Sequence, residues 1–145
     1  MTDEHTCSDV WNHEQRKEIV ATLEGVAAGH GARVDVACVM GDHVHMLLAP
    51  SGKGDTIMQL AGETKSKAWQ ACRKRGLSCP KWQVGMHDHI LRPSERCGEE
   101  WLNICFYVLN NPVRARYVKN WWDYPFILVG ERLKPYVQGC PGGGA

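Results

Sequence analysis

The sequence lacks the features that mark membrane and secreted proteins. None of the apolar runs in its 145 residues reaches the length of about 20 residues that a membrane-spanning helix needs. The first ten residues, MTDEHTCSDV, do not have the pattern of a signal peptide. The cysteines number seven, an odd count, and form no CxxC pair, which argues against a disulfide framework or a zinc ribbon. These absences predict a cytoplasmic protein in a reducing compartment.

The chain also lacks the strong net charge that by itself marks a nucleic-acid-binding protein. Its formal net charge is +1, and its composition, 43% hydrophobic and 23% charged, is that of a globular protein. At 145 residues it can bury one core, so we predict a single domain over residues 1–138. The glycine-rich residues 139–145 are predicted to be a disordered tail.

Positive charge is nevertheless concentrated in one part of the chain. Residues 64–83 contain no acid and carry six basic side chains: Lys65, Lys67, Arg73, Lys74, Arg75 and Lys81. Such a stripe can follow a phosphate backbone. A solvated helix face has the same composition, so both interpretations stay open at this point.

Two histidines flank one apolar residue in the stretch GDHVHMLL at residues 41–48. Side chains alternate along a strand, so His43, His45 and Leu47 are expected on one face. The two imidazoles then start roughly 7 Å apart and can converge on one divalent ion, with coordination positions left open. A pair of surface histidines at a strand start has the same spacing, and the stretch alone does not choose between these interpretations.

Apolar periodicity and turn residues predict an α+β order of elements. The expected elements are a helix from the capping box Asn12-His13-Glu14-Gln15 to Gly29, strands over 33–40 and 43–48, a helix from Asp55 to Gly76, short strands over 82–84 and 87–91, and a helix over about 97–110. Along the first strand, alternation places Val34, Val36, Cys38 and Met40 on one face.

The segment FYVLNNPVRA at residues 106–115 is the second informative stretch. Tyr107 and Asn111 are four residues apart and therefore share one helix face. Pro112 disfavours helical geometry at Asn111, so the helix is expected to end or kink there. A half-buried tyrosine and a helix-capping asparagine are the plain structural interpretations of the two residues.

Three ordered blocks carry a resemblance to a known family. They are VMGDHVHMLL at 39–48, WQVGMHDHILR at 82–92 and YVLNNPVRARYV at 107–118, followed by WDYP at 122–125. The chain resembles, over about residues 15–129, the HUH superfamily of single-strand DNA endonucleases. Within that superfamily it is most similar to the IS200-like Y1 transposases of the REP-associated tyrosine group.

This resemblance implies a fold, a reaction and a set of site residues. The implied fold is a ferredoxin-like antiparallel sheet with helices packed on one face. The implied activity is metal-dependent cleavage and transfer of hairpin-flanked single-stranded DNA through a 5′-phosphotyrosine. Tyr107 would be the nucleophile, and His43, His45 and Asn111 would hold Mg²⁺ or Mn²⁺. The basic stripe and Arg114 would contact the DNA backbone.

The chain departs from the family at its beginning. Relatives open with a strand, whereas MTDEHTCSDV has no convincing strand, and its absence would leave an unpaired edge beside the histidine strand. A DNA-hairpin-binding protein that has lost catalysis is therefore an alternative, and a water-using metallohydrolase is a third. The resemblance leaves monomer and dimer open and favours a monomer. Neither the target hairpin nor the physiological metal follows from the sequence.

Overall fold

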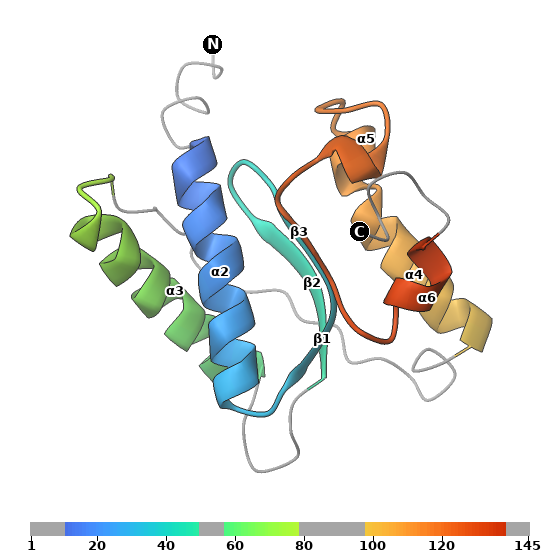
Figure 1. Ribbon diagram of the computed structural model, residues 1–145, viewed down its shortest axis with the longest axis horizontal. Helices are drawn as coiled ribbons and strands as arrows, with labels where there is room; N and C mark the ends of the chain where they lie inside the picture. The colour runs from blue at the N-terminus through green and yellow to red at the C-terminus, as the bar shows by residue number, and fades with distance from the viewer. Residues whose placement is uncertain (1–10, 50–56, 79–97, 139–145) are drawn as a thin grey trace.

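The computed structural model describes residues 11–49, 57–78 and 98–138 (Figure 1). The elements in chain order are α2 (His13–Gly29), β1 (Arg33–Val39), β2 (Val44–Ala49), α3 (Ile57–Lys74), α4 (Gly98–Leu109), α5 (Asn111–Arg114), the 3-10 turn η2 (Trp121–Asp123), β3 (Ile127–Val129) and α6 (Lys134–Val137). In this part of the chain, none of the helices combines the length and the apolar character needed to cross a membrane.

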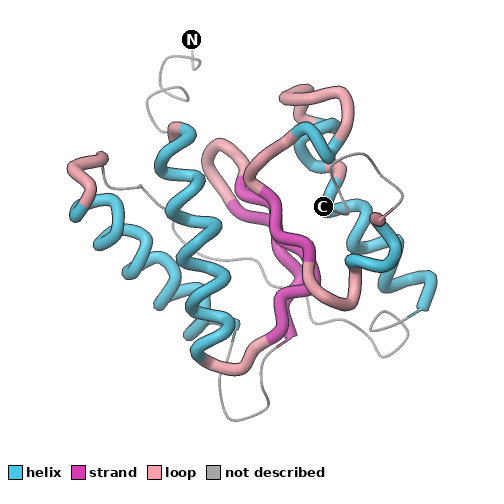
Figure 2. Tube along the Cα trace, viewed as in Figure 1, coloured by secondary structure: helices cyan, strands magenta, loops and turns pink. Residues whose placement is uncertain are grey.

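The three strands form one antiparallel sheet in the order β2-β1-β3. Strands β1 and β2 form the predicted hairpin, whose turn is closed by a 2.8 Å hydrogen bond from the Met40 amide to the His43 carbonyl. Both α2 and α4 pack against β1, and Figure 2 shows the sheet, in magenta, running between helical segments. The predicted α+β class, an antiparallel sheet with helices packed on it, is confirmed.

A bulge in β1 changes the phase of the predicted alternation. Val34 is paired with Leu48, but Val36 is paired with Leu47, so Asp35 has no partner of its own on β2. Because neighbouring residues of β2 point to opposite faces, Val34 and Val36 also lie on opposite faces. The expectation that Val34 shares a face with Val36 is therefore wrong. Beyond the bulge, Cys38 lies opposite His45 on the face that carries the histidines.

The helix α2 forms where its local signals predict. The Asn12 side chain accepts a 2.8 Å hydrogen bond from the Gln15 amide, and Gln15 Oε1 accepts a 2.7 Å bond from the Asn12 amide, which completes the predicted capping box. Buried Ile19, Leu23 and other apolar residues of α2 face the rest of the molecule. The helix α3 packs against α2.

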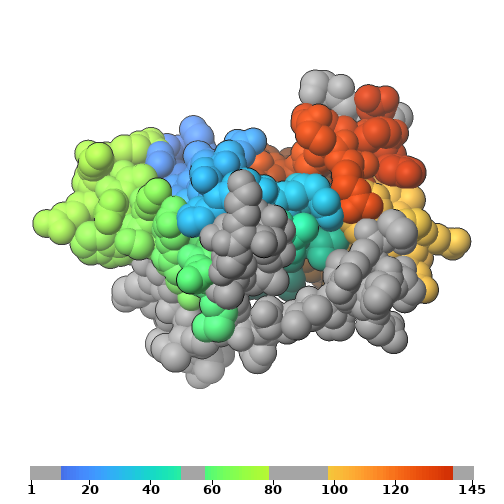
Figure 3. All heavy atoms as spheres, turned by 90° about the horizontal axis from the view of Figure 1, so that it is seen from below, coloured from blue at the N-terminus to red at the C-terminus, as the bar shows by residue number. Residues whose placement is uncertain are grey.

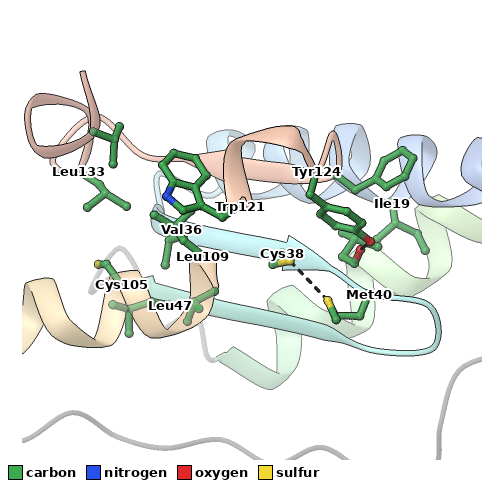
Figure 4. Packing of buried hydrophobic residues seen from close by; sticks show 14 of the residues in the cluster. Ile19, Val36, Cys38, Met40, Leu47, Cys105, Leu109, Trp121, Tyr124 and Leu133 are labelled. Atoms are coloured by element: carbon green, nitrogen blue, oxygen red, sulfur yellow. Dashed lines mark hydrogen bonds between the residues drawn. The ribbon is translucent and has the colours of Figure 1, made fainter. Parts of the chain in front are cut away.

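The core joins residues from both ends of the chain around β1 (Figure 4). The WDYP segment takes part in it, because Trp121 and Tyr124 are buried and Tyr124 donates a hydrogen bond to the carbonyl of Val39. Tyr124 also packs edge-on against Phe126, with ring centroids 5.4 Å apart. This aromatic segment therefore ties the C-terminal part of the chain to the end of β1 that precedes the histidines.

Several predictions fall outside the described residues. These are the missing first strand within residues 1–10, the Asp55 cap, the short strands over 82–84 and 87–91, and the tail over 139–145. Within the described residues, β2 pairs only with β1. The helix expected over about 97–110 is present as α4, and α3 ends before Gly76, which has a φ of +73°.

Candidate active site

The two histidines of the β1–β2 hairpin converge as predicted. His43 lies just before β2 and His45 lies within it, and their Nε2 atoms are 2.9 Å apart. The rings meet edge to face, with centroids 4.6 Å apart. Two nitrogens that each lie about 2.1 Å from one ion, at about a right angle, are about 3 Å apart. The spacing of the pair therefore fits two ligands of a single metal ion.

Asp42 orients the first of these rings, a role that the sequence interpretation missed. The Nδ1 atom of His43 lies 2.6 Å from Oδ1 of Asp42, so Nδ1–H donates to the carboxylate. This bond selects the tautomer whose Nε2 lone pair faces His45. The available signal was an acidic residue directly before the two histidines, since carboxylates commonly orient metal-binding imidazoles in this way.

The surroundings of His45 favour its neutral form. Burial is the main cause that lowers the pKa of this imidazole, and the neighbouring His43 and the charge of Arg114 lower it further. A neutral imidazole is the form that binds metal ions. The surroundings of His45 therefore favour the ligand-competent state at neutral pH.

Tyr107 and Asn111 lie on either side of the predicted helix break. The helix α4 ends at Leu109 and α5 begins at Asn111, with Pro112 in its first turn, so the expected interruption is confirmed. Tyr107 is 62% exposed, which makes it available to a large substrate. Asn111 is only 8% exposed and does not cap α5 through its side chain.

The amide of Asn111 is incompletely satisfied. Its Oδ1 accepts a hydrogen bond from Arg114, while its Nδ2 is the one buried side-chain nitrogen or oxygen, among the described residues, without a hydrogen-bond partner. Buried polar atoms are nearly always paired in folded proteins, and exceptions mark strained or functional positions. An amide oxygen has two lone pairs, so Oδ1 can accept from Arg114 and still bind a cation.

Arg114 connects the tyrosine, the asparagine and the histidine pair. Its guanidinium carbon lies 3.7 Å from the centroid of the Tyr107 ring, and it donates a 2.7 Å hydrogen bond to the Tyr107 carbonyl. The same guanidinium donates to Asn111, and its charge contributes to lowering the pKa of His45. Arg114 was predicted as a DNA contact, and the structure places it against Tyr107 and Asn111.

The side chains at this site fit a divalent ion that has neutral protein ligands. Within the described parts of the chain, no group of three or more His, Cys, Asp or Glu residues is arranged to hold a metal ion. The Asn111 amide oxygen is of a type that Mg²⁺ and Mn²⁺ accept, so it is a candidate third ligand beside His43 and His45.

The structure does not bring the predicted basic stripe to this site. Five of its members lie on α3 or directly after it, at the end of the molecule opposite α4 and α5 in Figures 1 and 3: Lys65, Lys67, Arg73, Lys74 and Arg75. Lys67 pairs with Glu63 at 3.1 Å, and Arg75 pairs with Glu14 at 2.6 Å and also with Glu18. Lys81 lies outside the described residues.

Three comparisons with known proteins complete this description. No protein-family model matches the chain, and no curated protein matches it. Among solved structures, the chain matches a REP-associated tyrosine transposase bound to a REP hairpin, with a TM-score of 0.67 and 20% sequence identity. The match covers 92% of this chain and 74% of the transposase. The resemblance drawn from the sequence is thus confirmed at the level of the fold: this protein has the fold of a REP-associated tyrosine transposase.

Proposed function

We propose that this protein is a metal-dependent endonuclease and transesterase that cleaves single-stranded DNA beside a hairpin and forms a 5′-phosphotyrosine. The observation that carries the proposal is the convergence of His43 and His45, at 2.9 Å, together with an arginine that contacts both Tyr107 and Asn111 and whose charge helps to lower the pKa of His45. The solved structure with the same fold is a transposase bound to a DNA hairpin, which supports DNA as the substrate.

The metal would have three protein ligands in this proposal, namely His43, His45 and the amide oxygen of Asn111. When bound there, it supplies Lewis-acid stabilisation of the negative charge on the scissile phosphate. Asp42 acts on this site as a positioning residue, because its bond to Nδ1 keeps the Nε2 lone pair of His43 directed at the ligand position.

Tyr107 would be the nucleophile. Its phenolic oxygen attacks phosphorus and loses its proton to solvent, the new O–P bond forms, and the bond from phosphorus to the 3′ oxygen breaks. The leaving 3′ oxygen takes a proton and becomes a free hydroxyl. A hydroxyl from the same or another strand can reverse the reaction, so strands are exchanged without an external energy source.

Arg114 is placed to assist this step. A guanidinium 3.7 Å from the ring centroid stabilises negative charge that develops on the phenolic oxygen. It can also contact an oxygen of the phosphate, because arginine presents several N–H donors in a fixed plane. Its bonds to the Tyr107 carbonyl and to Asn111 hold it in place for both contacts.

A covalent-adduct gel tests the proposal. Labelled single-stranded hairpin oligonucleotides are incubated with the protein and Mn²⁺ or Mg²⁺, and a shifted band resistant to denaturation is expected. The band should disappear with EDTA and in Tyr107→Phe. Tyr136→Phe is the matched control, because it makes the same change at another exposed tyrosine, on α6, and should keep the band.

The other outcomes identify the alternative functions. A mobility shift with hairpin DNA but no covalent band would indicate a binding protein without catalysis. Metal-dependent cleavage that survives in Tyr107→Phe would indicate a hydrolase that uses water, and it would contradict the assignment of the nucleophile.

A further inference from the structure

The basic side chains closest to the candidate site in sequence differ from those of α3 in their surroundings. Between Glu100 and Asp123 the chain contains no acid and carries Arg114, Arg116 and Lys119. Arg116 and Lys119 are exposed, and neither has an ion-pair partner among the described residues. By contrast, Lys67 and Arg75 on the α3 side are paired with glutamates. The positive charge of Arg116 and Lys119 is therefore not offset by an ion pair within the described residues and is available to an external anion.

Arg116 occupies a backbone position that favours glycine. Its φ is +63°, and it is the one residue other than glycine with a positive φ in the described part of the chain. The amide of Tyr117 donates to the Pro112 carbonyl at 2.9 Å, and that of Arg116 to the Val113 carbonyl at 3.0 Å. These bonds form the left-handed cap that often ends a helix with glycine. A long cation in this position has a conformational cost and gains no partner among the described residues.

Tyr117 presents a prearranged aromatic surface beside Arg116. The residue is 48% exposed, although its ring contacts two other groups. The Arg16 guanidinium carbon lies 5.9 Å from the ring centroid, and the Tyr124 ring centroid lies 6.0 Å away. A ring supported in this way loses little freedom when a base stacks on its exposed part, and stacking on aromatic side chains is a general means of binding single strands.

We propose that Arg116, Tyr117 and Lys119 form a surface that binds the single DNA strand as it leaves the candidate active site. Arg116 and Lys119 contact backbone phosphates, and Tyr117 stacks with a base. This surface, termed the post-α5 surface, lies in the loop that follows α5 on the opposite side of the sheet from α3 (Figure 2). The inference rests on the proposed function, since it takes Tyr107 as the point of strand cleavage.

The test measures DNA binding separately from cleavage. The full chain carrying Tyr107→Phe is titrated into a fluorescein-labelled oligothymidylate of about 12 nucleotides, and anisotropy is followed at several salt concentrations with Mn²⁺ present. Each lost phosphate contact should reduce the salt slope by about 0.7, which corresponds to about fourfold weaker binding near 0.15 M salt.

Arg116→Gly separates a binding role from a structural one. Glycine suits the positive φ, so this variant should unfold at the same or a higher temperature than the parent while binding DNA about fourfold more weakly. Unchanged DNA affinity, or a fall in stability together with affinity, would overturn the role of Arg116.

Lys119→Ala and Lys74→Ala form a matched pair that compares the two basic regions. Both replace an exposed lysine, one in the post-α5 surface and one on α3. Only Lys119→Ala should weaken binding and reduce the salt slope. A loss in Lys74→Ala with none in Lys119→Ala would place the strand along α3 instead and overturn the proposal.

Tyr117 is tested by two substitutions of similar size. Tyr117→Phe should bind as the parent does, because it keeps the ring, while Tyr117→Leu should bind at least about fivefold more weakly. Equal binding by the two would exclude stacking.

Failure of this inference can be told apart from failure of the proposed function. If the variants bind normally while the chain that keeps Tyr107 forms a covalent adduct, the strand follows another path and the enzyme assignment stands. If the variants lose binding and the adduct never forms, the post-α5 surface is supported as a DNA-binding surface and the proposed cleavage chemistry is contradicted. If the parent binds no oligothymidylate at all, the proposed surface is wrong.

Discussion

Removing one buried hydroxyl tests whether the aromatic WDYP segment holds the histidine hairpin in place. Tyr124 is buried, and its hydroxyl donates to the carbonyl of Val39, the last residue of β1. His43 follows four residues later, after the turn. Tyr124→Phe removes this hydrogen bond and keeps the ring that packs against Phe126 at 5.4 Å.

The expected loss of stability follows from this geometry. A buried hydrogen bond contributes about 1 kcal/mol net, and a carbonyl left without its donor adds to the cost. We therefore expect Tyr124→Phe to lower the free energy of unfolding by about 1.5 kcal/mol. For a chain of this size that corresponds to a melting temperature lower by about 3–6 °C.

The same substitution changes how the free energy of unfolding depends on pH in the alkaline range. Burial raises the pKa of Tyr124 to about 12, with Arg16 opposing part of that rise. The phenol of the unfolded chain has a pKa of about 10, so above that pH the unfolded state loses a proton that the folded state keeps. This group's contribution to stability is therefore complete below pH 10 and falls by up to about 1.4 kcal/mol per pH unit between about 10 and 12. The stability of Tyr124→Phe should not show this loss at alkaline pH.

Urea unfolding at several values between about pH 8 and pH 11 measures both effects. Tyr136→Phe, at an exposed tyrosine, is the control for the chemical change alone. Cys38 adds to the raised pKa of Tyr124, so the difference in slope between wild type and variant reports Tyr124 together with its coupling to Cys38. A variant as stable as wild type near neutral pH, with the same alkaline slope, would refute the reasoning.

Four further predictions concern other parts of the structure. Asp42→Asn should weaken Mn²⁺ binding about tenfold by calorimetry, because the orienting carboxylate is lost; unchanged affinity would exclude its role. Gly130→Ala should lower stability by at least about 2 kcal/mol in urea unfolding, because the added methyl group would lie 2.1 Å from a backbone oxygen of β1. Asn12→Ala should cost about 1 kcal/mol in the same assay through loss of the capping box. Cys38 and Cys105 are buried and have pKa values raised to about 12, so iodoacetamide should leave both unmodified in the native protein, as read by peptide mass mapping.

Much of the fold followed from local signals. The capping box at Asn12, the helical spacing after it, and the interruption at Pro112 each depend on residues a few positions apart, and each appears as predicted. The convergence of His43 and His45 also needs only the period of a strand and a short turn. Interactions of this range are encoded in consecutive residues, so they can be read without knowledge of the rest of the chain.

The bulge at Asp35 could not be predicted in this way. Its carboxylate lies 2.7 Å from Arg33 Nε and accepts a 2.9 Å hydrogen bond from Trp101 Nε1, and its carbonyl accepts from the Gly130 amide. Two of these three partners come from distant parts of the chain. The alternation rule therefore failed at Val34, because contacts made after the chain folds changed the phase of the strand.

For the candidate site, the sequence by itself determined which residues are predicted to carry the chemistry: the histidine pair, Tyr107 and Asn111, through their spacing and their resemblance to a family. Only the tertiary structure decided how they are supported. It showed that Asp42 orients His43, that Arg114 contacts Tyr107 and Asn111, and that the basic residues of α3 lie on the other side of the sheet. The physical reason is the distance along the chain over which each interaction acts. Backbone geometry sets the spacing of residues that are neighbours in sequence, whereas a charged side chain interacts with any residue that the fold brings near it.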